Sequence, residues 1–143
     1  MTAMTSTRHE DVTTARRATY GGQMSLVLVV AFALSGTHTW YSWVTGIGED
    51  SFTVTTPVAW AFYAIGFAAA GLCRRNQQWA QWLVTIYLAL LVLFAVFYYP
   101  TTFGARQQTT FGWFENDVYT ALLVLALYLG VQRLRRVTLS TRS

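Results

Sequence analysis

The fold is decided where a polar turn meets an apolar run, in the stretch Trp113-Phe114-Glu115-Asn116-Asp117-Val118-Tyr119. Two carboxylates and an amide lie there between large aromatic side chains. The apolar run behind the turn, from Val118 to Gln132, covers roughly 22 Å at about 1.5 Å per residue. A bilayer core is about 30 Å thick, so we expect the turn at headgroup depth or deeper. Carboxylates at that depth are costly unless they are paired, hydrated or functional.

The composition of the chain indicates a membrane protein. Of its 143 residues 54% are hydrophobic, 16% aromatic and only 11% charged, whereas a soluble domain carries roughly a quarter charged residues. All basic residues are arginine, and they lie beside apolar runs. We therefore interpret the arginine residues behind the net charge of +4 as signals of membrane topology. We expect the lipid bilayer as a partner and no nucleic acid. The single Cys73 excludes an internal disulfide.

Four apolar segments are long enough to predict helices. We place them at about 24–43, 57–73, 79–99 and 115–132, with Pro57 at the start of the second and Pro100 stopping the third. The Thr- and Ser-rich residues 1–20 are expected to form a disordered cytoplasmic tail, 21–136 the transmembrane domain and 137–143 a second tail. The sequence thus predicts an all-α, polytopic integral membrane protein with a four-helix transmembrane bundle.

The distribution of arginine predicts the orientation of that bundle. Three lie in the N-terminal tail, two in the middle turn and four at the C-terminal end, which leaves only Arg106 in the other two loops. By the positive-inside rule we expect both termini to be cytoplasmic, and we expect the protein to span the plasma membrane. Four of the six acidic residues then lie on the outer side.

Small residues recur along the second predicted helix at steps of three and four. We expect the face formed by Ala61, Ala64, Ala68 and Gly71 to pack against a neighbouring helix, so that a larger side chain there disrupts the fold. Gly66 and Ala70 form a second small pair. The sequence leaves the oligomeric state open.

The polar residues near the outer side predict a cup that opens outward. Its acid–base candidates are His38, Glu115 and Asp117, and its ligand-binding candidates are Trp40, Tyr41, Glu49, Asp50, Trp113, Asn116 and Tyr119. Partial dehydration disfavours the charged form of a carboxyl group, which suits a general acid near neutral pH. Aromatic walls can bind or stabilise a cation.

The two carboxylates of the turn are not expected to be equivalent. Residues two apart on a helix point about 200° apart, so only one of Glu115 and Asp117 can face the bundle. We expect Glu115 to be buried, because Tyr119 lies one turn below it and can donate a hydrogen bond. Asp117 then acts mainly as a charge near the start of the helix.

A structural interpretation of the same residues competes with the cup. Asn116 is a good helix cap, Glu115 and Asp117 stand where a helix N-terminus favours negative charge, and the aromatic side chains form an ordinary interfacial belt. His38 is then a packed histidine.

Three classes of function fit these observations. The favoured one is an accessory subunit, or a binder of a lipophilic ligand or a membrane-protein partner, acting through the outer cup. The alternative is a membrane-embedded isomerase or cyclase that uses acid–base chemistry on a lipophilic substrate, and the third is a small transporter or channel. The sequence does not decide whether the protein is an enzyme. It lacks HxxxH, ExxH and paired cysteines, so we expect no metal and no cofactor.

Overall fold

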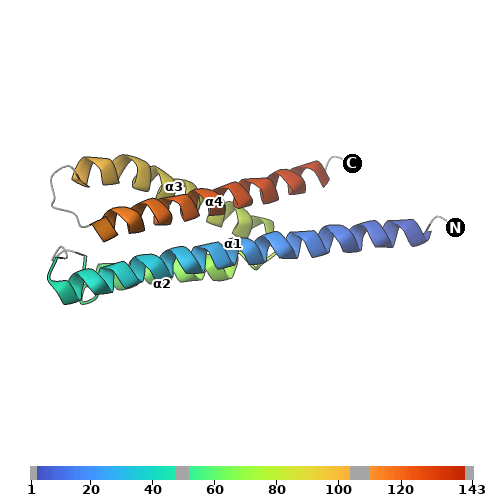
Figure 1. Cartoon of the computed structure of the whole chain (residues 1–143). Coiled ribbons are helices and arrows are strands. Elements are labelled where there is room, and N and C mark those ends of the chain that lie inside the picture. Colours follow the sequence, from blue (N-terminus) through green and yellow to red (C-terminus); the bar gives the residue numbers. More distant parts are fainter. Residues whose placement is uncertain (1–2, 48–51, 104–109, 141–143) are drawn as a thin grey trace.

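The computed structural model describes residues 3–47, 52–103 and 110–140 and is helical almost throughout these ranges. Its helices are α1 (Ala3–Thr45), α2 (Pro57–Leu72), α3 (Gln78–Phe103) and α4 (Thr110–Ser140), and the described residues contain no strand. The helices run alternately up and down, so the N- and C-termini lie at the same end of the bundle (Figure 1). We call the opposite end the distal end. The predicted all-α four-helix bundle is confirmed.

Three of the helices are long and apolar enough to cross a membrane. The spans are Tyr20–Thr45, Gln78–Phe97 and Thr110–Arg136, while α2 is a shorter apolar helix of 16 residues. Large apolar side chains such as Leu26, Trp60 and Leu90 point outward on three different helices. A surface of this kind is stable against lipid tails, as in an integral membrane protein.

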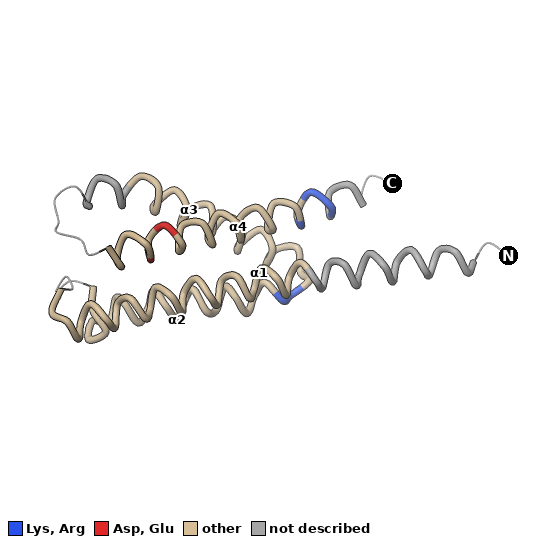
Figure 2. The backbone as a smooth tube through the Cα atoms, viewed as in Figure 1, with Lys and Arg blue, Asp and Glu red and all other residues tan. Residues whose placement is uncertain are grey.

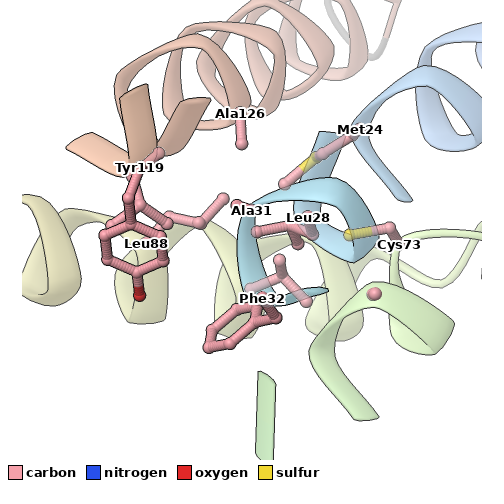
Figure 3. Packing of buried hydrophobic residues seen from close by; sticks show 11 residues of the cluster. Met24, Leu28, Ala31, Phe32, Cys73, Leu88, Tyr119 and Ala126 are labelled. Carbon is pink, nitrogen blue, oxygen red and sulfur yellow. The ribbon is translucent and has the colours of Figure 1, made fainter. Parts of the chain in front are cut away.

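The core lies around α1, which packs against both α2 and α4. Figure 3 shows Leu28, Ala31 and Phe32 of α1 among Tyr119 and Ala126 of α4 and Leu88 of α3. The Phe32 ring is fully buried and meets the rings of Phe62, Tyr63, Phe67 and Tyr119 at centroid distances of 5.4 to 6.5 Å. Helix α3 packs mainly on α4 and barely contacts α2.

Helices α1, α3 and α4 extend beyond the predicted boundaries, whereas α2 agrees with its predicted range to within one residue. Residues 3–20, expected to be disordered, form the first turns of α1. They contain neither Gly nor Pro before Tyr20, and a helix that continues an existing one has no nucleation cost. Helix α3 continues to Phe103, past Pro100, so the predicted stop at this proline is wrong. The proline costs the helix one backbone hydrogen bond without ending it.

The prediction that the small-residue face of α2 packs against a neighbouring helix of the chain is wrong. Ala61, Ala64, Ala68 and Gly71 are all exposed in the bundle. The buried residues of α2 are instead Ala59, Gly66, Ala69 and Ala70. The second small pair therefore makes the contact, because Gly66 lies directly against the bulky ring of Phe32.

A buried arginine closes the end of the bundle that carries the termini. Arg133 is only 3% exposed, and its guanidinium donates to the Cys73 carbonyl at 2.6 Å, the Arg75 carbonyl at 3.1 Å and the Asn76 side-chain oxygen at 3.0 Å. We call this set the arginine latch. It joins α4 to the turn between α2 and α3, where the last carbonyls of a helix need donors.

Close backbone packing surrounds the latch. A Cβ atom on Gly21 of α1 would lie 2.6 Å from the Cys73 carbonyl oxygen, so only glycine fits there. Burial raises the pKa of the Cys73 thiol to about 11, although the nearby Arg133 charge opposes this shift. The thiol therefore stays protonated near neutral pH and is a packing group rather than a nucleophile.

Candidate functional site

Glu115 is buried at the distal end of α4. Its exposed fraction is 7%, whereas Asp117, two residues further on, is exposed. This difference confirms that the two carboxylates are not equivalent and that Glu115 faces the bundle. The 200° between side chains two residues apart on a helix accounts for it.

The start of α4 rules out the interpretation of these residues as helix caps. The helix begins at Thr110, so Asn116 lies in its second turn and cannot be the N-cap residue. Glu115 is likewise five residues inside the helix, and the first turn contains no acidic side chain. The favourable effect of a helix N-terminus fades within one turn, so capping does not explain the burial of Glu115.

Glu115 meets two side chains of α1. Its Oε2 atom lies 3.6 Å from Nδ1 of His38, and the Ser35 hydroxyl lies near its carboxylate. On the other side of the imidazole ring, Nε2 of His38 lies 3.5 Å from the Ser42 hydroxyl. The structure thus brings together two of the three predicted acid–base residues, His38 and Glu115, and leaves Asp117 outside.

A second branch extends these contacts to α2. The Tyr63 hydroxyl lies 2.6 Å from the Thr39 hydroxyl and 3.4 Å from that of Ser35. These side chains come from α1, α2 and α4, and we call them the distal polar network. Its members are Ser35, His38, Thr39, Ser42, Tyr63 and Glu115. It is a connected set of polar side chains inside an otherwise apolar bundle.

Sequence reasoning missed Ser35, Thr39 and Tyr63. The signal was present on the first helix, because Ser35, His38, Thr39 and Ser42 follow the spacing i, i+3, i+4, i+7 that places residues on one helix face. Tyr63 carries no such signal, since one tyrosine in an apolar helix resembles any other core aromatic residue.

Aromatic rings border the network at its exposed edge. The Phe111 ring lies 5.7 Å from the His38 ring and 5.3 Å from that of Tyr41, measured between centroids. Tyr41 and Phe111 are both partly exposed. We call Tyr41 and Phe111, with the exposed side of His38, the aromatic edge. Phe111 was not among the predicted site residues.

The other predicted ligand-binding residues do not join this edge as a group. Trp40 is 56% and Trp113 51% exposed, so both belong to the outer surface, where an interfacial belt is expected. Tyr119 is buried in the core against Phe32. Asn116 is half-buried, and Glu49 and Asp50 lie outside the described residues.

An apolar layer separates the distal polar network from the arginine latch. Leu28, Ala31, Phe32, Leu123 and Ala126 are fully buried between the two polar clusters. The charges are divided in the same way, with acidic residues near the distal end of α4 and basic residues at the other end (Figure 2). The buried carboxylate is thus far from the arginine side chains that the structure describes.

No protein-family model, curated protein or solved structure matches this chain. The site must therefore be interpreted from its own chemistry. Within the described residues no three His, Cys, Asp or Glu side chains come close enough to hold a metal ion. A carboxylate beside an imidazole can exchange protons with a bound molecule or pair with a positive group.

Proposed function

We propose that the protein is a non-catalytic membrane protein that binds a lipophilic ligand, or a membrane-protein partner, at its distal polar network. The observation that carries this proposal is Glu115, a carboxylate 7% exposed inside a span of mostly apolar residues. An ionisable side chain at membrane depth is costly, and it marks a functional site by default. Its contacts come from another helix, α1, rather than from its own local turn, which favours a binding site over a helix terminus.

Transport has less support from the same structure. A carrier or channel needs polar groups along a path from one side of the membrane to the other. Here the polar groups form two clusters with the apolar layer around Phe32 and Leu123 between them. The distal polar network therefore fits a site that opens to one side only.

An acid–base isomerase or cyclase is the second candidate. The observation that favours it is the distance of 3.6 Å between Nδ1 of His38 and Oε2 of Glu115, which brings a general acid and a general base onto facing helices. A lipophilic substrate reaching this pair would find both groups at one edge. Chemical conversion of the bound molecule would distinguish this enzyme from a binding protein.

Replacing Glu115 with glutamine should abolish binding and leave the fold intact. Glutamine has the same shape, so the change removes the charge without opening a cavity. The protein is purified from its native membranes into lipid nanodiscs, and molecules bound at stoichiometric amounts are identified by native mass spectrometry. We expect a bound molecule with the original chain and none with Glu115→Gln.

Asp117→Asn is the matched control for that experiment. It also removes one carboxylate from α4, but from an exposed position, so binding should be retained. Equal loss of the ligand in both variants, or no bound molecule with any of them, would overturn the binding proposal. Release of a chemically altered product after the recovered molecule is added back would assign the enzyme instead.

We also propose that the protein spans the plasma membrane with both termini cytoplasmic. The nine-to-one division of arginine residues between the two sides supports this orientation. A reporter that is active only in the cytoplasm, fused before Met1 or after Ser143, should be active at both ends. An inactive reporter at either end contradicts the orientation.

A further inference from the structure

We infer that the ligand of the distal polar network is a lipophilic cation, an apolar molecule with one positive charge that pairs with Glu115 at the aromatic edge. This inference rests on the proposed binding function and adds the chemical class of the ligand. This class of ligand follows in three steps from the charge around the carboxylate, its remaining hydrogen-bonding capacity and the shape of the aromatic edge.

The first step is the charge around Glu115. Within the part of the chain whose side chains are described, every arginine lies at the end that carries the termini: Arg74, Arg75, Arg133, Arg135 and Arg136. The apolar layer separates them from Glu115, so no permanent cation of the described bundle neutralises its carboxylate. A carboxyl group buried in this way either stays protonated or needs a counter-charge, and a cationic ligand supplies one.

The second step is the hydrogen-bonding capacity that remains at the site. An ionised carboxylate has about four lone-pair positions, and the nearby Ser35 hydroxyl can fill at most one of them. The distance of 3.6 Å to His38 Nδ1 exceeds the range of about 2.7–3.2 Å for a direct hydrogen bond. The carboxylate of Glu115 therefore keeps the capacity to pair with the positive group of a ligand that approaches from the side of His38.

The third step is the aromatic edge beside the carboxylate. Tyr41 and Phe111 stand with ring centroids 5.3 Å apart, and both are partly exposed. The faces of aromatic rings attract a cation and repel an anion, while their apolar area contacts the body of a lipophilic molecule. Charge and shape thus select the same class of ligand.

Two probes of the same shape and opposite charge test the inference. Tetraphenylphosphonium and tetraphenylborate are titrated separately onto the full chain in nanodiscs of zwitterionic lipid, and binding is measured by isothermal titration calorimetry against empty nanodiscs. We expect saturable binding of tetraphenylphosphonium, at least 10-fold tighter than that of tetraphenylborate. Glu115→Gln should weaken binding of the cation at least 10-fold, and Asp117→Asn should change it less than 2-fold.

A second variant keeps the test decisive if Glu115→Gln does not fold. His38→Arg retains the carboxylate and places a permanent cation beside it, so it should also abolish binding of tetraphenylphosphonium. Equal binding of both probes, or unchanged cation binding in His38→Arg and Glu115→Gln, would overturn the cationic ligand. The binding function would still stand if native mass spectrometry finds a neutral molecule that depends on Glu115, and it fails separately if no molecule is found.

Discussion

Replacing Gly66 with alanine should lower the stability of the bundle sharply, although it adds only one methyl group. A Cβ atom at this position would lie 2.4 Å from two carbon atoms of the Phe32 ring. That ring is fully buried and enclosed by four other aromatic rings, so it cannot move aside without disturbing them. Overpacking of this kind costs about 1–3 kcal/mol.

Gly71 provides the control on the same helix. A Cβ atom there meets nothing within 4 Å, so Gly71→Ala should leave stability unchanged or raise it, because alanine has the higher helix propensity. Thermal unfolding in detergent micelles, followed by circular dichroism, compares the two variants with the original chain. Equal unfolding temperatures for Gly66→Ala and Gly71→Ala would show that α2 does not pack on Phe32 as described.

Replacing Arg133 with methionine should destabilise the bundle at the end that carries the termini. Methionine replaces the aliphatic part of the arginine side chain, but it cannot donate to the Cys73 and Arg75 carbonyls or to Asn76. These oxygens would lose a charged donor in a buried position, at a cost of about 2–3 kcal/mol. The loss should appear as a lower unfolding temperature and as faster proteolysis of the turn between α2 and α3.

Arg135→Met and Arg136→Met separate this effect from the general role of arginine at the membrane surface. Arg135 is exposed. Arg136 also lies at the surface, where it donates to the Tyr20 hydroxyl at 3.1 Å and covers its ring. Each substitution removes the same charge from the same end, and each should cost about 1 kcal/mol or less. If all three variants unfold alike, the arginine latch contributes nothing beyond its charge.

The architecture could be predicted from the sequence because the bilayer imposes strong constraints. Long apolar segments and Pro57 at a helix start are local signals, and they located all four helices. The packing faces were harder to predict. On α2 the spacing of Ala61, Ala64 and Ala68 was as regular as that of Gly66 and Ala70, and only the position of Phe32 on another helix determines which set is buried.

The candidate site could be predicted only in part, because some of its residues meet only when different helices pack together. The non-equivalence of Glu115 and Asp117 followed from helix geometry, whereas the choice of Glu115 as the buried one rested on the position of Tyr119. His38 was selected as an ionisable group inside a span. Tyr63 and Phe111 entered the site only through the arrangement of three helices, which no spacing within one segment encodes. Arg133 was interpreted as a topology signal, and its neighbours in sequence gave no indication that it is buried while Arg135 and Arg136 are exposed.

The unequal lengths of the helices make the thickness of the bilayer a variable in the stability of this protein. The 16 residues of α2 cover about 24 Å and the 26 residues of the α1 span about 39 Å at 1.5 Å per residue. A bilayer core of about 30 Å is too thick for the first and too thin for the second. Lipid must compress beside α2 while α1 tilts or extends into the headgroups, at a cost of fractions of a kcal/mol per ångström. A membrane of shorter acyl chains therefore relieves the mismatch at α2 and increases it at α1, so that no single thickness fits both helices.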